Sequence, residues 1–94
     1  MAVSEDSTRR HVVITGEVQG VSFRDATRKE AEDAGLAGWV RNRDDGSVEA
    51  VFEGDADAVD RLLDWCRSGP SSADVDDVED SEEEPQGESG FEVR

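Results

Sequence analysis

The stretch HVVITGEVQGVSFRDATRKEAEDAG, residues 11–35, places a strand pattern, a glycine-containing loop and a helix pattern in direct succession. Residues 11–15 are rich in β-branched side chains and end at Gly16, which predicts a first strand with Val12 and Ile14 on its buried face. The loop then leads directly into the helix. The sequence therefore predicts a βα unit at the start of the fold.

The predicted first helix has signals at both ends. Ser22 is the expected N-cap, with Asp25 three residues later, and Gly35 supplies a C-terminal stop. One face of this helix should pack on the sheet, because small and apolar side chains recur there at helical spacing: Phe23, Ala26, Thr27, Ala31 and Ala34.

The middle of the chain predicts a β-hairpin. Two β-type runs, 39–41 and 47–53, flank a segment with the pair Asp45-Gly46, which is a strong hairpin-turn signal. Alternation in the second run places Glu49 and Glu53 toward water. The residues that alternate with them should face the core: Val48, Ala50 and Phe52.

A second helix should follow the hairpin. Asp55 or Asp57 is the expected cap, Trp65 flanks the apolar stripe, and Gly69-Pro70 ends the helix. The stripe has the spacing i, i+3, i+4 and i+7 of a helix face, and its members are Val59, Leu62, Leu63 and Cys66.

The last third of the chain is acidic and predicts two more strands. In the strand at 73–79, Val75 and Val78 are three residues apart, which breaks strict alternation and indicates a bulge or an edge strand. Residues 81–89 are polar and turn-like, and residues 91–94 are expected to form a terminal strand.

The predicted element order is βαββαβ with a short extra β segment. An antiparallel sheet with two helices on one face is the ferredoxin-like α/β sandwich, an α+β fold. We therefore expect a single domain over residues 1–94, with residues 1–9 forming a flexible polar arm.

Charge is the most unusual property of the composition. The formal net charge is -15 and the pI is about 4.1, and Lys29 is the only lysine. No basic stripe is available to displace phosphate counterions, so nucleic acid is not an expected partner. Acidic residues within the predicted elements favour adaptation to molar salt, where charges are screened over about 3 Å. An ordinary acidic protein is the alternative.

Few residues offer metal, redox or nucleophilic chemistry. Cys66 is the only cysteine, and His11, the only histidine, is expected to be structural. Asp74, Asp76 and Asp77 lack a cation-binding loop framework, so neither a metal nor another cofactor is expected. Because no signal sequence or membrane-spanning apolar run is present, we expect a cytoplasmic protein without membrane contact. We also expect a monomer.

The loop between the first strand and the first helix has the features of an anion site. Gly16 and Gly20 allow successive main-chain N–H groups to converge, and the helix N-terminus adds about half a positive charge. Arg24 lies in the first helical turn, where its guanidinium can donate two hydrogen bonds to one phosphoryl group. A plain turn with a solvated arginine would fit these residues as well.

Longer motifs separate these two interpretations. Residues 16–24, GEVQGVSFR, closely resemble the acylphosphatase family signature G-x-V-Q-G-V-x-[FY]-R. Residues 38–42, 45–49 and 90–94 resemble the second motif, the hairpin and the C-terminus of that family, in its order and spacing. The resemblance extends over residues 11–94.

The resemblance implies an enzyme that hydrolyses the carboxyl–phosphate bond of small acyl phosphates without metal or cofactor. It implies that Arg24 binds phosphate and that Asn42 holds the attacking water. Without the resemblance, a turn former would be the better interpretation of Asn42. The implied phosphate cradle consists of the main-chain N–H groups of Val18, Gln19, Gly20, Val21, Ser22 and Phe23.

Two carboxylates near the predicted phosphate site should weaken the binding of an anion there. Glu17 stands where relatives often carry a basic or neutral residue, and Asp25 follows Arg24, so binding of a dianion should be weaker in dilute buffer than in salt.

The alternative function is a non-catalytic acylphosphatase-like binding module, which could lose Arg24 or Asn42. A ferredoxin-like RNA- or metal-binding domain is disfavoured by the charge and by the lack of a Cys-x-x-Cys motif.

Overall fold

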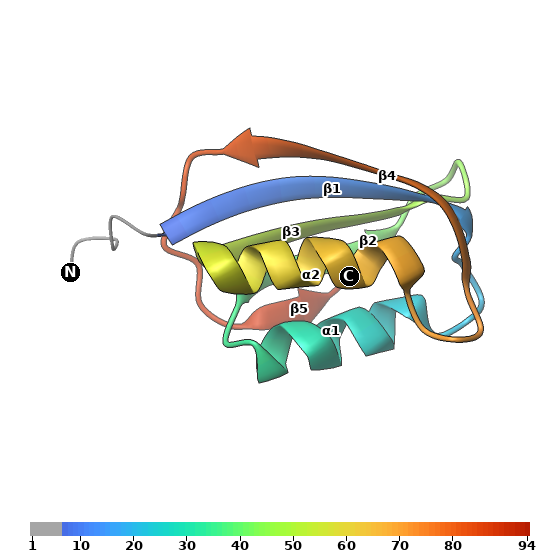
Figure 1. Ribbon diagram of the computed structural model, residues 1–94, viewed down its shortest axis with the longest axis horizontal. Coiled ribbons are helices and arrows are strands. Elements are labelled where there is room, and N and C mark those ends of the chain that lie inside the picture. Colours follow the sequence, from blue (N-terminus) through green and yellow to red (C-terminus); the bar gives the residue numbers. More distant parts are fainter. Residues whose placement is uncertain (1–6) are drawn as a thin grey trace.

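The computed structural model describes residues 7–94. Its elements are β1 (Ser7–Glu17), α1 (Phe23–Asp33), β2 (Ala37–Asn42), β3 (Val48–Asp55), α2 (Ala56–Ser68), β4 (Asp74–Glu83) and β5 (Phe91–Val93). The strands form one sheet in the order β4-β1-β3-β2-β5. Both helices lie on one face of this sheet (Figure 1). The predicted ferredoxin-like α+β fold is confirmed.

The sheet is mixed, so the prediction of a wholly antiparallel sheet is wrong for its last strand. All pairings among β1, β2, β3 and β4 are antiparallel, whereas β5 pairs in parallel with β2. β4 runs opposite to β2, and residues 84–90 reverse the chain direction before β5 begins. β5 therefore runs in the direction of β2 and extends the sheet at that edge.

The core lies between the sheet and the two helices. The predicted inward-facing residues of β1 and β3 are fully buried, and the predicted stripe of α2 is buried with them. Phe23 at the start of α1 packs against Trp65 of α2, with ring centroids 5.5 Å apart. This contact fixes the start of α1 relative to α2. Within residues 7–94, neither helix is long and apolar enough to cross a membrane.

Two charged segments form strand where the sequence predicted none. Residues 7–9 of the expected arm belong to β1, and residues 81–83 of the expected turn region belong to β4. Residues 9–11 pair with residues 81–83, and Arg9 and Glu83 form an ion pair of 2.9 Å across this ladder. Opposite charges thus replace the apolar alternation that usually marks strands. Residues 1–6 of the expected arm lie outside the described residues.

A bulge in β4 explains the unusual valine spacing. The register between β1 and β4 shifts at Thr15 and Gly16, where Asp76 is the extra residue on β4. The bulge brings Val75 and Val78 to the same face, and both pack against the core. β4 is also an edge strand. Both structural explanations of this spacing are therefore confirmed.

The sheet face opposite the helices contains a buried carboxylate that the sequence placed in water. Glu53 is only 6% exposed and lies 3.2 Å from the Arg9 guanidinium. Burial alone would raise the pKa of the Glu53 carboxyl, but hydrogen bonds from the Gln86 main chain and from Arg9 lower it to below its ordinary value. Glu49 is half-buried. The expected exposure of both glutamates to water is therefore wrong for this face of the sheet.

Candidate active site

A pocket of about 340 Å³ lies between the start of α1 and the ends of β2 and β5. It contains both predicted site side chains, Arg24 and Asn42, and four of the six predicted cradle residues. Gln19 and Val21 of the predicted cradle do not line it. The lining residues are Val18, Gly20, Ser22, Phe23, Arg24, Asp25, Asn42 and Val93.

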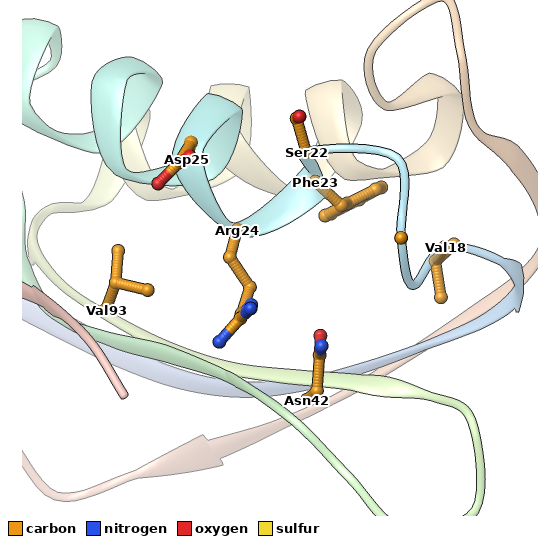
Figure 2. A pocket seen from close by; sticks show the side chains of 8 residues that line it. Val18, Ser22, Phe23, Arg24, Asp25, Asn42 and Val93 are labelled. Carbon is orange, nitrogen blue, oxygen red and sulfur yellow. The ribbon is translucent and has the colours of Figure 1, made fainter.

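The two polar side chains reach the pocket from separate elements. Arg24 lies in the first turn of α1, and Asn42 is the last residue of β2, paired with Val48 of β3. Figure 2 shows the two side chains pointing into the same space from opposite sides. Arg24 Nη1 donates to the main-chain oxygen of Arg94 at 3.1 Å, which restrains the guanidinium. A guanidinium has five N–H donors, so this single bond leaves donors for an anion.

The loop before α1 presents main-chain N–H groups to the pocket. Gly20 and Ser22 have φ angles of 75° and 61°, and positive φ values in such a loop turn successive N–H groups toward one side, as in anion-binding nests. No main-chain oxygen within residues 7–94 accepts a hydrogen bond from the N–H groups of residues 19–23. These N–H groups are available to the oxygen atoms of a bound anion.

Ser22 occupies the predicted N-cap position of α1 but does not cap the helix. It is left-handed, whereas a capping residue is normally extended, and its side chain forms no capping hydrogen bond. The predicted capping interaction near Asp25 is therefore wrong, although the predicted helix start is correct. In Figure 2 the Ser22 hydroxyl points away from Arg24 and Asn42. The first turn of α1 remains open to the pocket.

Side-chain anchors hold the loop in place. Val18 and Phe23 are each 1% exposed, so the loop is fixed in the core at both ends. The Ser72 hydroxyl donates to the main-chain oxygen of Val21 at 2.9 Å. Gly69 ends α2 against the Phe23 ring, where a Cβ atom would come within 2.6 Å of a ring carbon. These contacts keep the loop close to the other elements of the pocket.

The two carboxylates singled out in the sequence differ in position. Asp25 lines the pocket, whereas Glu17 is exposed at the end of β1, paired with Asp74 of β4. Asp25 is thus the one of these two carboxylates that borders the pocket directly, and Glu17 does not line it.

The other chemically distinctive residues do not line this pocket. His11 Nε2 lies 2.5 Å from a carboxylate oxygen of Glu49 on the sheet face opposite the helices. Cys66 is buried in the core, and this burial raises the pKa of its thiol to about 12. Within the part of the chain that the structure describes, no group of three or more His, Cys, Asp or Glu side chains is arranged to hold a metal ion.

The fold and the pocket define a class of protein: a small ferredoxin-like α+β domain in which an arginine and a carboxamide share a pocket with main-chain N–H groups that have no main-chain acceptor within residues 7–94. The acylphosphatase family model matches residues 10–93. An acylphosphatase from Haloquadratum walsbyi is 53% identical over 92 residues, which cover 98% of this chain and 99% of that relative. The chain belongs to the acylphosphatase family. The expected family and the expected class of enzyme, a hydrolase, are confirmed.

Solved structures agree with this assignment. The structure of an acylphosphatase from Coxiella burnetii has a TM-score of 0.92 and 41% identity, covering 96% of this chain and 95% of that chain. A full-length HypF, solved in its phosphate- and nucleotide-bound form, has a TM-score of 0.83 and 23% identity. That match covers 94% of this chain but 12% of the HypF chain, and at this identity it shows a shared fold alone.

Proposed function

We propose that this protein hydrolyses acyl phosphates and that Arg24 and Asn42 have separate roles in the reaction. The main-chain N–H groups of residues 18–23 and the Arg24 guanidinium bind the phosphoryl oxygens. Asn42 orients the attacking water. The observation that carries the proposal is the convergence of Arg24 and Asn42 on one pocket, beside N–H groups that have no main-chain acceptor within residues 7–94.

The chemistry of an acyl phosphate suits such a site. Water forms a bond to phosphorus as the bond between phosphorus and the acyl oxygen breaks, and the carboxylate leaves with the electron pair of that bond. The leaving group is already good, so the protein mainly has to align water and stabilise charge on the equatorial oxygens. The amide of Asn42 can accept from and donate to water without titrating. A phosphoryl oxygen of the substrate receives the proton that the water loses.

A non-catalytic binding module on the same scaffold is the second candidate. Such a module could lose Arg24 or Asn42, whereas the enzyme needs both, because it has to align water as well as bind phosphate. The presence of Asn42 in the pocket therefore favours the enzyme. Phosphate binding without turnover would favour the module.

The test is hydrolysis of benzoyl phosphate from millimolar to molar KCl. We expect Arg24→Ala to lower kcat/KM by about a thousandfold or more, because it removes charge-assisted donors to the phosphoryl group. Arg28→Ala is the matched control, since Arg28 is exposed one turn further along α1 and its removal changes the net charge equally. It should retain activity within about twofold.

Asn42→Ala separates catalysis from binding. We expect kcat to fall by about a hundredfold, because the water loses its orientation. Inhibition by inorganic phosphate should remain close to that of the unmodified protein, because the cradle and Arg24 are intact. An unmodified protein that hydrolyses no acyl phosphate at any KCl concentration would exclude the enzyme.

We further propose a cytoplasmic monomer whose site discriminates little between acyl groups. The interactions assigned to the substrate centre on its phosphoryl group, and the apolar side chains at the pocket are few. We also propose that salt raises activity, because Asp25 borders the pocket and Glu17 lies near it on a chain with a net charge of -15. Screening weakens such repulsion more than it weakens hydrogen bonds at contact distance.

A further inference from the structure

We propose that Gln19 is a positioning residue for this reaction, because its side-chain amide holds the phosphate cradle in register with Asn42. The inference rests on the proposed function, in which the cradle binds phosphate and Asn42 aligns water. Gln19 itself does not line the pocket. We therefore expect Gln19 to act by setting the distance between the bound phosphoryl group and the water that Asn42 aligns.

The Gln19 side chain links the cradle to the turn between β2 and β3. Its Nε2 atom lies 2.7 Å from the main-chain oxygen of Arg43 and 2.9 Å from that of Ser47, so both N–H groups of the amide donate. Arg43 directly follows Asn42, and Ser47 directly precedes Val48, the β3 partner of Asn42. The two bonds therefore hold both sides of the turn at the point where Asn42 lies. In Figure 1 the loop after β1 and this turn lie at the same end of the molecule.

The turn is closed by hydrogen bonds of its own. Arg43 N donates to the Ser47 oxygen at 2.9 Å. The Asp45 carboxylate accepts from the Ser47 main-chain N–H at 3.0 Å and from its hydroxyl at 2.5 Å. Because the turn does not need Gln19 to form, the main consequence of the Gln19 bonds is the placement of the cradle beside it.

This link needs a side chain with two donors and no charge. A carboxylate in place of the amide would face two carbonyl oxygens without a proton to share, and an apolar side chain would leave that contact empty. Either change removes the restraint between cradle and turn. A shift of about 1 Å between bound phosphate and aligned water lowers turnover by about a hundredfold.

The first test is Gln19→Met, which keeps a long unbranched side chain and removes both donors. We expect kcat for benzoyl phosphate to fall about ten- to a hundredfold, while the inhibition constant of inorganic phosphate changes less than about twofold. Gln86→Met is the matched control, because it makes the same substitution at an exposed residue that does not line the pocket and keeps the Gln86 main-chain N–H. Its kcat should stay within about twofold of the unmodified value.

The second test is a double-mutant cycle with Asn42→Ala. If Gln19 acts through Asn42, adding Gln19→Met to Asn42→Ala should lower kcat by less than about threefold further. A merely structural role would instead multiply the two effects. Melting temperatures of all variants, measured in the same molar KCl, identify any loss of folded protein.

The third test is Gln19→Glu, which remains informative if Gln19→Met fails to fold. Its kcat should be low at pH 7 and rise as the pH falls toward 5, because a protonated carboxyl regains one donor. The unmodified protein should show no such rise.

Three outcomes would overturn the role of Gln19 alone: unchanged kcat in both Gln19 variants, multiplicative effects in the cycle, or phosphate binding that weakens in step with kcat. Full activity of Asn42→Ala, or an inactive unmodified protein, would overturn the proposed function and this inference with it. The two failures are therefore distinguishable.

Discussion

Two loops of this molecule present main-chain N–H groups beside an arginine, and the protein uses them differently. Residues 84–90 lie beside Arg9, and there the Glu53 carboxylate accepts from the N–H groups of Gln86 at 2.7 Å and Glu88 at 2.9 Å. Residues 18–23 lie beside Arg24, and within the described residues their N–H groups from 19 onward have no main-chain acceptor. One loop is filled by the protein's own anion, and the other is open.

The difference shows how the same donors can serve either the fold or a ligand. Polar groups buried in a protein are nearly always hydrogen-bonded, and Glu53 meets this requirement for its loop. The pocket beside Arg24 is open to solvent, so its N–H groups can be left to water or to an anion. Where the fold supplies no internal carboxylate, such N–H groups stay available to an external anion.

Among the changes that test this comparison, breaking the filled loop should have the largest effect. Glu53→Gln should lower the free energy of unfolding by about 3 kcal/mol, because the amide NH₂ would face a main-chain N–H donor and Arg9 would lose a buried partner. Urea unfolding in molar KCl measures this. The control is Glu82→Gln, an exposed β4 position with the same change in charge, which should stay within about 0.5 kcal/mol. Equal effects at both positions would contradict the comparison.

The pH dependence of the same variant sharpens the first prediction. The pKa of Glu53 is lower in the folded protein than its ordinary value, so its stabilising contribution is complete above the unfolded pKa, about 4.3, and is lost as the pH falls through the folded pKa. The stability gap between the unmodified protein and Glu53→Gln should therefore shrink below about pH 4.3. Unfolding curves at a series of pH values measure the gap, and a gap of constant size down to pH 3 would exclude this origin.

The smallest effect should come from placing a carboxylate at the open loop. Ser22→Asp adds a negative charge at the uncapped start of α1, and Ser22→Asn is the neutral control of similar shape, since both residues tolerate the left-handed conformation. We expect the inhibition constant of inorganic phosphate to rise about tenfold in dilute buffer for Asp only, or about 1.4 kcal/mol. Molar KCl should reduce the difference. Equal inhibition constants for the two variants would show that charge at this position does not reach the pocket.

The sequence predicted those parts of the fold that depend on the local spacing of apolar residues and on the residues that cap or end helices. The α2 stripe and the stop at Gly69 follow from neighbouring residues. The cap was narrowed to Asp55 or Asp57, and the structure shows Asp55, which accepts from Ala58 N at 3.3 Å. The bulge was predictable from the spacing of Val75 and Val78. These signals are local, so a single sequence is enough to reveal them.

The features that the sequence did not predict depend on contacts between distant segments. Alternation separates the two faces of β3 but does not show that residues 84–90 cover Glu53 on the outer face. The parallel pairing of β5 depends on how the chain crosses the sheet, which no local pattern records.

For the candidate site too, local signals were predictable and contacts between distant segments were not. The motif indicated the region of Arg24 and Asn42, and the structure places both in one pocket. The contacts of Arg24 with Arg94 and of Gln19 with the β2–β3 turn join residues far apart in the chain, so their partners were not predictable from the sequence. The left-handed Ser22 was missed because a serine before a helix is usually a cap.

With Arg24 in its proposed role, the short strand β5 makes turnover a late and sensitive sign of correct folding. Its three residues pair with β2, and the residue after it, Arg94, supplies the oxygen that restrains Arg24 and an N–H that donates to Val40 O at 2.8 Å. Joining segments so distant in the chain costs loop-closure entropy, and non-local pairings of this kind form slowly. During refolding, returning helical content would report little about three residues at a sheet edge. Returning turnover would report whether the two most distant parts of the pocket have met.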